Sequence, residues 1–497
     1  MSVELPSLSS GVGSSSNGPP DGSGSGEQSD PDSRISELSE AIFDEIRSST
    51  WAVSSSRAQT IYRVPKEKLQ AADKGSYQPS YISFGPYYQG DAATEEMRHN
   101  ERGKQFLLHL VVQSLQGPGR PGPSVVEQFM QAIAPMEARA RSCYEGDIRM
   151  EWDAFCKMLL LDSVQLMKLL ELLGRPQAAA AVGVVCPQDC KCVPCNTKAH
   201  DQSMTVHDLM MLENQIPFFV VEKVYDLCYA GVANGNGTRR PPIAELAWRT
   251  IQRIMEGVLT PTAFAGPPTT CDHLVQLCHV YLKSSCLCLP TSPLAGKYGR
   301  FRRATEYYEA GVNFRPWGTD DDPADKRRRP LLDVAFSGGV VRMAPQKVDE
   351  RTGYLLRNVL AYEQRYLGWA ARRDRSYVAA YVVFMSQLMG GPADVALLSR
   401  RGVVEHLLGS DGDVCALFQR LTDGLAFDPG SHHYLNPVGM ALQAHCRSRL
   451  HRWRAWVVRH RFANPWLLAA WVFGALAVLG TIIQTVLAVL SYLKCTK

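Results

Sequence analysis

The sequence predicts a mainly α-helical fold with a small β-hairpin element, arranged as a single long helical domain plus one C-terminal transmembrane helix. Three observations support this fold class. Apolar residues recur with a helical period through most of the body. One pair of short alternating segments, joined by a glycine turn, is typical of a β-hairpin. A long stretch near the C-terminus carries no charge.

The chain of 497 residues has the composition of a globular protein with an unusual beginning. Charged residues make up 21% and hydrophobic residues 45%, which excludes wholesale disorder, and the net charge of +4 excludes a histone-like polycation. Residues 1–40 are rich in Ser, Gly and Pro and contain no aromatic residue, so they are predicted to be disordered. We expect the helical domain over residues 41–460 and the transmembrane helix over residues 464–493.

Three stretches in the first half of the domain have helical period. Glu95–Gln116 is amphipathic, and Glu151–Leu173 is apolar nearly all round, which predicts a central core helix. The third stretch, Asp208–Leu227, contains Pro217. Proline should end or kink this helix after Gln215, because it removes a backbone donor and disfavours helical geometry in the preceding residue.

The second half combines the hairpin with further helices. The segments Leu331–Phe336 and Val340–Met343 flank a Ser-Gly-Gly turn and predict the two strands. Asp394–Leu408 and Asp413–Leu425 are separated by a Gly-Ser-Asp-Gly turn and predict two helices. The last helix before the membrane is expected over Val438–Phe462.

The charge-free stretch over residues 462–493 predicts a membrane anchor. As a helix, its apolar part would rise about 40 Å, enough to cross a bilayer core of about 30 Å. Trp466 and Trp471 near one end and Tyr492 near the other suit interfacial positions. The alternative is a buried core helix, but such helices rarely run this long without a charge.

Charges beside the span predict its orientation. Only Lys494 and Lys497 follow it, whereas six arginines precede it: Arg447, Arg449, Arg452, Arg454, Arg459 and Arg461. Positive charge concentrates on the cytoplasmic side, so we expect a single-pass tail anchor with the body in the cytoplasm, at the plasma membrane or an endomembrane. The sequon at Asn236 should therefore remain unmodified.

Polar residues inside the span have two interpretations. Thr481, Gln484 and Thr485, together with the small pair Ala470 and Gly474, suit helix–helix contact in lipid and an oligomer formed through the anchor. Alternatively, the polar side chains are simply tolerated, with threonine bonding its own helix backbone.

Short motifs follow one another in a characteristic order along the body. They are Ile61–Pro65, Tyr77–Pro79, Ser83–Tyr88, Met97, Lys104, the helix around Asp162, Asp208–Phe219, His273–Leu274, Ala304–Glu306, Glu309–Val312, Leu331–Val334, Asn358, Glu363–Gln364, and Asn464–Trp466 with Thr481, Gln484 and Thr485. This order resembles one plant family, the domain of unknown function 247, over about residues 43–493. The resemblance implies a membrane-anchored plant protein without established enzymatic activity. Some members of that family are implicated in grass self-incompatibility, as pollen-side recognition determinants.

Seven motif positions are the candidate site residues: Glu213, Asn214, Gln215, Pro217, Asn358, Glu363 and Gln364. One interpretation is an enzyme in which Glu213, Asn358 and Glu363 meet in a cleft. The other, which we favour, is structural. Polar side chains beside a proline bond the backbone groups that a buried helix break leaves free.

Four cysteines form the one candidate metal site: Cys186, Cys190, Cys192 and Cys195. Four thiolates within ten residues would hold zinc tetrahedrally, and zinc-dependent binding of a partner is one hypothesis. Structural zinc sites usually draw ligand pairs from separated segments, so a reduced loop is the favoured alternative. We therefore predict no cofactor.

The leading functional hypothesis is a membrane-anchored, non-catalytic recognition or signalling-scaffold protein, which binds the membrane through its C-terminal helix and presents its body to protein partners of unknown identity. No HExxH, Gly-x-Ser-x-Gly, Walker A or dinucleotide motif occurs. No nucleic-acid partner is predicted, because the position of the arginines beside a span already accounts for them.

Overall fold

The computed structural model describes the chain in segments, which fall into two units, Met1–Arg57 and Ala58–Lys497. In the first unit, residues 39–44 form a short helix with exposed side chains. All elements below belong to the second unit. The described residues are 39–44, 59–64, 74–116, 121–174, 199–229, 240–256, 267–283, 300–318, 331–368, 376–428, 433–447 and 465–495.

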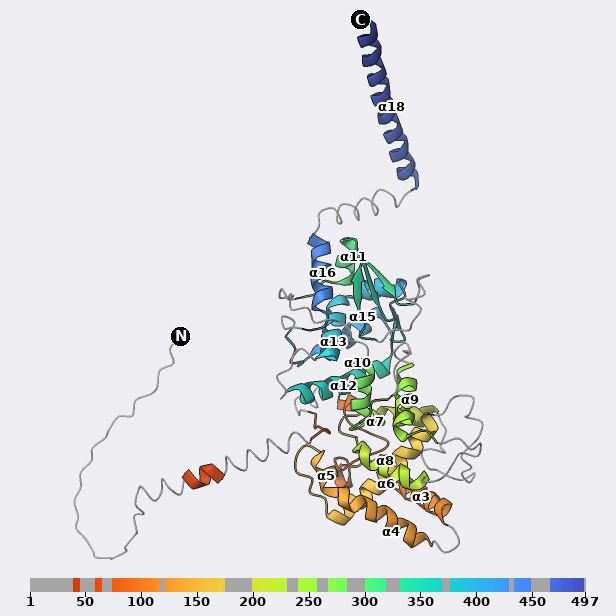
Figure 1. Ribbon diagram of the computed structural model, residues 1–497, viewed down its shortest axis with the longest axis vertical. Coiled ribbons are helices and arrows are strands. Elements are labelled where there is room, and N and C mark those ends of the chain that lie inside the picture. Colours follow the sequence, from red (N-terminus) through yellow and green to blue (C-terminus); the bar gives the residue numbers. More distant parts are fainter. Residues whose placement is uncertain are drawn as a thin grey trace, which may run out of the picture. The chain divides into compact units, whose positions relative to one another are not determined.

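The first half of the body is organised around α6 (Trp152–Leu173), as its apolar sequence predicts. Its side chains from Phe155 to Glu171 are buried except for two lysines. Figure 1 shows neighbouring helices around α6. Those in contact with it are α3 (Glu95–Leu115), α4 (Gly122–Ile133), α5 (Glu137–Ser142), α8 (Phe218–Tyr229) and α9 (Ile243–Glu256). The remaining elements here are α7 (Ala199–Leu209) and the 3-10 turns η1 (Lys74–Ser76), η2 (Gly90–Ala92) and η3 (Ala134–Met136).

The helix predicted over Asp208–Leu227 is interrupted earlier than expected. Helix α7 ends at Leu209, six residues before Gln215, and α8 begins at Phe218, directly after Pro217. Proline is well suited to that position, because the first N–H groups of a helix have no partner within it. The N–H of Phe218 instead donates to the carbonyl of Asp272, at 2.8 Å.

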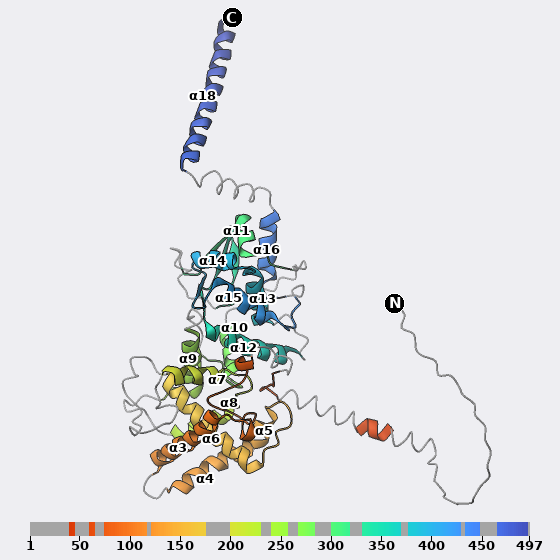
Figure 2. The same cartoon turned by 180° about the vertical axis from the view of Figure 1, so that it is seen from behind.

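In the second half, helix α13 (Tyr377–Leu388) is buried along its length and contacts α10, α12 and α15. In Figure 2, which views the molecule from behind, α14 lies beside α11 and α15. The prediction over Asp394–Leu408 is wrong beyond Arg400. Gly402, with a φ of 71°, turns the chain there, and a strand follows. The helices are α10 (Leu274–Lys283), α11 (Ala304–Glu309), α12 (Glu350–Gly368), α13 (Tyr377–Leu388), α14 (Pro392–Arg400), α15 (Asp411–Thr422) and α16 (Asn436–Arg447).

The predicted hairpin is confirmed, although its first strand is shorter than expected. Strands β2 (Ala335–Ser337) and β3 (Val340–Met343) pair antiparallel, with Ser337 opposite Val340. Gly338 and Gly339, at φ values of 57° and 79°, form the two-residue turn, which needs positive φ at both positions. The prediction did not include β1 (Asn313–Pro316), parallel to β3, or the parallel pair β4 (Gln346–Val348) and β5 (Val404–His406).

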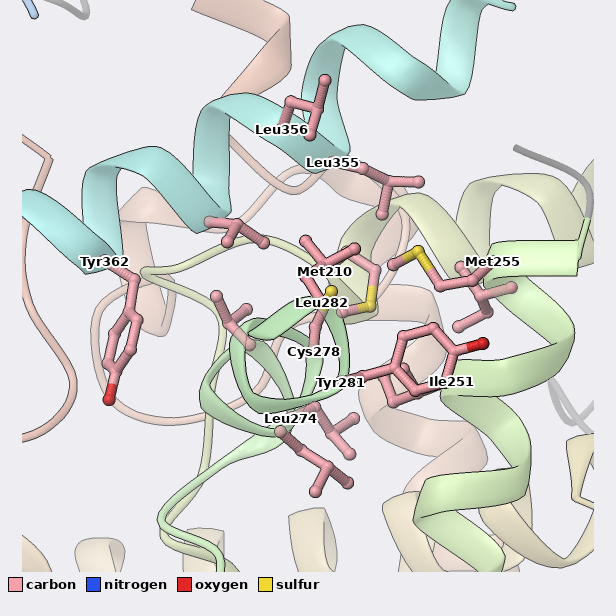
Figure 3. Packing of buried hydrophobic residues seen from close by; sticks show 14 of the residues in the cluster. Met210, Ile251, Met255, Leu274, Cys278, Tyr281, Leu282, Leu355, Leu356 and Tyr362 are labelled. Atoms are coloured by element: carbon pink, nitrogen blue, oxygen red, sulfur yellow. The ribbon is translucent and has the colours of Figure 1, made fainter. Parts of the chain in front are cut away.

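The core is continuous from α9 through α10 to α12. Figure 3 shows α10 between these two helices, with apolar side chains from all three directed toward one another. Met255 of α9, Cys278 and Leu282 of α10, and Leu355 and Leu356 of α12 meet there and are buried. This packing fixes α12, whose other faces carry residues of the sites described below.

Helix α18 (Pro465–Cys495) exposes a long run of apolar side chains. Its segment Phe473–Ser491 has a mean hydropathy of 2.2, is long enough to cross a membrane, and buries nothing within the structure. The hydroxyl of Thr481 donates to the carbonyl of Ala477, and that of Thr485 to Thr481. Both threonine hydroxyls therefore donate to carbonyls of their own helix, as one of the two interpretations expected. The side chains of Trp466, Trp471 and Tyr492 lie outside the described residues.

Candidate functional site

A buried polar network joins the segment between α7 and α8 to the chain before α3. We call it the motif network; its centre is Asp162, Asp208, Glu213, Asn214 and Gln215, each at most 4% exposed. Residues 80–85 run through it without belonging to any strand. Their backbone N–H groups therefore need acceptors from side chains, because an unpaired buried N–H is costly.

Asp208, near the end of α7, receives three consecutive backbone donors. The amides of Ser80, Tyr81 and Ile82 lie 3.1, 2.6 and 2.8 Å from its Oδ2. Its Oδ1 lies 2.8 Å from Nδ1 of His207. One carboxylate thus serves as the hydrogen-bond partner that a neighbouring strand would otherwise supply.

Asn214 and Asp162 continue the same pattern along the segment. Asn214 accepts from the N–H of Phe84 at 2.7 Å and donates to the carbonyl of Ile82 at 3.0 Å. Asp162, on α6, accepts from the N–H of Gly85 at 2.7 Å. Three polar side chains from separate positions therefore hold one extended segment in register.

Asp162 also forms a buried ion pair with Lys104 of α3. Nζ lies 2.6 Å from Oδ1, and neither side chain is more than 1% exposed. The ammonium donates in addition to the carbonyl of Ser83, at 2.6 Å, and contacts Glu101. Burial raises the pKa of Asp162 to about 6, although the Lys104 charge opposes this shift.

Glu213 fixes a second stretch of the N-terminal chain. Its Oε1 accepts from the N–H of Val64 at 2.7 Å, and its Oε2 from the hydroxyl of Tyr88 at 2.6 Å. Burial, together with the Glu213 charge, raises the pKa of Tyr88, so the phenol stays protonated and donates.

Gln215 satisfies the helix break, as the structural interpretation of the motif predicts. Its Nε2 donates to the carbonyls of Leu209 and Met211, both at 2.8 Å, and its Oε1 accepts from the N–H of Val275 at 3.3 Å. These carbonyls lie at the end of α7, where a helix leaves acceptors without internal partners.

The motif residues of α12 have similar contacts. Asn358 accepts from the N–H of Leu212 and donates to the carbonyl of Ser76, both at 2.8 Å. Glu363 accepts from the first N–H groups of α13 at 2.9 and 3.0 Å, and its Oε2 lies 2.9 Å from His279 Nε2. Gln364 is half-buried beside it.

Glu213, Asn358 and Glu363 therefore hold backbone groups of separate segments, and each is at most 4% exposed. Buried side chains that bond backbone groups in this way support the fold, and the three residues do not meet in an open cleft. Cys186, Cys190, Cys192 and Cys195 lie outside the described residues, so the zinc hypothesis stays a prediction. In the described part of the chain, no group of three or more His, Cys, Asp or Glu is placed to hold a metal ion.

An open cleft of about 420 Å³ lies beside the motif network. Sequence reasoning missed it, because its residues come from four separate segments and none belongs to a recognisable catalytic motif. His207 lines the cleft and also contacts Asp208 of the motif network. The lining residues are Gly75 and Ser76 of η1, His207 of α7, Asp349 just before α12, Glu350, Gly353, Tyr354 and Arg357 of α12, Leu408 between β5 and α15, and Asp413, Leu417 and Arg420 of α15.

Comparison with known proteins gives a family match over most of the chain. The family DUF247, described as plant protein of unknown function, matches residues 61–480. UPF0481 protein At3g47200 of Arabidopsis thaliana is 22% identical over 457 residues, which cover 88% of this chain and 87% of the relative. Putative UPF0481 protein At3g02645 of the same plant is 23% identical over 167 residues, 34% of this chain and 27% of the relative. No solved structure gives a significant match.

Proposed function

Because the chain belongs to the DUF247 family of plant proteins, whose function is unknown, we propose that it is a membrane-anchored recognition or signalling-scaffold protein without catalytic activity. The observation that carries the proposal is the surface of α18. Along Phe473–Ser491 its apolar side chains are exposed and pack against none of the other residues that the structure describes. Exposing such a continuous apolar surface to water is costly, whereas a lipid environment accommodates it.

The orientation and the role of the body follow from charge and from the motif network. The arginine excess before α18 supports a cytoplasmic body. The motif residues hold the fold together and leave its surface free to present loops and the cleft to protein partners. A role in self-incompatibility is part of this proposal, and its only support is the family resemblance.

A self-association of the anchor is part of the proposal. Small or polar residues follow one another along α18 with alternating spacings of four and three residues, the period of a left-handed helix pair. Gln484 is near the middle of this stripe and carries both a donor and an acceptor. The stripe consists of Ala470, Gly474, Ala477, Thr481, Gln484, Ala488 and Ser491.

The anchor is tested by fractionating plant cells that express the full chain or a variant lacking residues 465–497. We expect the full chain to remain in membranes after alkaline carbonate extraction and the truncated chain to become soluble. The double variant Leu479→Arg/Ile483→Arg should also be soluble, since each arginine at the centre of a span costs about 2.5–3.5 kcal/mol. Crosslinking of the full chain in these membranes should give a dimer.

The matched control is Leu479→Ala/Ile483→Ala, which keeps the span apolar and should stay in the membrane. A full chain that carbonate releases, or a truncated chain that resists release, would refute the anchor. A monomer after crosslinking would refute the self-association and leave the anchor standing.

A further inference from the structure

We propose that Ser410 is a phosphorylation site for a protein kinase that selects serines followed by acidic residues. Ser410 lies in the turn between β5 and α15, directly before Asp411, the first residue of α15. Its side chain is exposed. The site belongs to the body and is independent of the membrane anchor and of the motif network.

Carboxylates follow Ser410 at the first and third positions. They belong to Asp411, which is half-buried, and to Asp413, which is exposed. Protein kinases distinguish their substrates partly by charge pattern, because basic side chains in the kinase pair with acids beside the acceptor. Within the described ranges, no other serine or threonine has carboxylates at both positions. The pattern therefore singles out Ser410 on the surface that the structure describes.

The Ser410 hydroxyl is accessible to a second protein. It donates to Oδ2 of Asp413 at 2.8 Å and accepts from the N–H of Asp413 at 3.2 Å, both within its own turn. A Cβ at Gly412 would lie 3.4 Å from Oγ of Ser410, so glycine leaves that side of the hydroxyl uncovered. Leu407, three residues earlier, is 79% exposed. A kinase can therefore approach this turn without displacing core side chains.

The first turn of α15 can open at low cost, which matters because a kinase binds its substrate in an extended form. The turn includes Gly412, and glycine lowers the stability of a helix by about 1 kcal/mol relative to alanine. The first buried side chain of α15 is Val414, so residues 411–413 can leave the helix without exposing the core. Helix ends open at a small fraction of the global unfolding free energy.

The modification is a phosphoryl transfer from ATP. Oγ of Ser410 forms a bond to the γ-phosphorus while the bond from that phosphorus to the β,γ-bridging oxygen breaks. ADP leaves with the electron pair of the broken bond, and the hydroxyl proton passes to the catalytic carboxylate of the kinase.

The phosphate would change the rim of the cleft. Phosphoserine carries a charge of about −1.5 to −2 at pH 7, whereas the unmodified hydroxyl is a neutral donor to Asp413. The Asp413 carboxylate would then face a like charge and turn away from Ser410. Because Asp413 lines the cleft together with the exposed Glu350, the modified rim becomes more negative and is reshaped at this point.

The test is incubation of the full chain in lipid nanodiscs with ATP, magnesium and casein kinase II, an acid-directed kinase. Mass spectrometry of proteolytic peptides measures the initial rate of phosphate transfer to Ser410. A synthetic peptide of residues 403–416 gives the rate for the same pattern without the fold. We expect the chain to react at no less than about a tenth of the peptide rate, since one helical turn must open. Protein kinase A, which selects basic residues before the serine, should leave Ser410 unmodified.

Variants show whether the acidic pattern directs the kinase. Asp413→Asn keeps an oxygen for the Ser410 hydroxyl but removes the charge, so it should slow the reaction about tenfold. Asp413→Glu keeps the charge and should stay within about twofold of the parent chain. The matched control is Glu405→Gln, which removes an exposed carboxylate before the serine and should leave the rate unchanged. Ser410→Ala should abolish the modified peptide.

The proposal is overturned if the peptide is phosphorylated and Ser410 of the chain is not, because the fold then blocks the site. It is overturned equally if neither is phosphorylated, or if Asp413→Asn reacts as fast as the parent chain. None of these results would affect the anchor, which is measured by fractionation.

Discussion

Replacing Lys104 with methionine is expected to lower the free energy of unfolding by about 3–5 kcal/mol, because it leaves the buried carboxylate of Asp162 without its cation. The side chain keeps a similar length, so little packing is lost. The urea midpoint of the purified protein in detergent measures the change. Arg149→Met is the control: its pair with Asp147 is exposed, at 89% and 78% for the two side chains, and should show no measurable change.

The loss in Lys104→Met should shrink as the pH falls. The pKa of Asp162 in the folded state is raised to about 6, above the ordinary value of 3.8. The folded state therefore holds the proton more tightly than the unfolded state, and protonation of Asp162 favours folding as the pH falls through about 6 toward 4. Without Lys104 this pKa rises further. The double variant Lys104→Met/Asp162→Asn should recover stability at pH 7, because it removes the charge and keeps an oxygen for Gly85. A single variant as stable as the parent would contradict this account of the pair.

Replacing Asp208 with alanine is expected to cost at least about 3 kcal/mol, since three backbone N–H groups lose one buried acceptor. The effect should be local as well as global. The rate of amide hydrogen exchange at Ser80, Tyr81 and Ile82 should increase more than the exchange rate of the amides in α6. Asp208→Asn keeps one oxygen and should cost less.

Asp147→Ala tests whether loss of any carboxylate has this effect. Asp147 is exposed, and among the described residues its carboxylate accepts from Arg149, so its loss should leave the urea midpoint and the exchange of residues 80–82 unchanged. Unchanged exchange in Asp208→Ala would show that the segment is held by its apolar side chains instead.

The helices with a strong sequence signal were predicted well, and the errors have local causes. The apolar residues of α6 required burial on all sides, and the amphipathic pattern of α3 required one buried face. The early end of α7 could not be predicted from Pro217, because side chains of the motif network satisfy the unwound turn. Strand β5 is three residues long and needs β4, far away in the sequence, to form.

Only part of the motif network was named as candidate site residues from the sequence, namely Glu213, Asn214 and Gln215. Lys104, Asp162 and Asp208 entered the sequence analysis only as positions that match the family, and the ion pair between Lys104 and Asp162 was not predicted. The sequence contains no signal for the three amides that Asp208 accepts, because residues 80–82 lie more than 120 positions away. The cleft depends on four segments that only the folded chain brings together.

The most direct test of the central claim, an anchored protein with a cytoplasmic body, is the glycosylation state of Asn236 in microsomes that contain the full chain with a sequon tag after Lys497. We expect an unmodified Asn236, a glycosylated tag, and digestion of the body by added protease. A glycan on Asn236 and a protected body would contradict it.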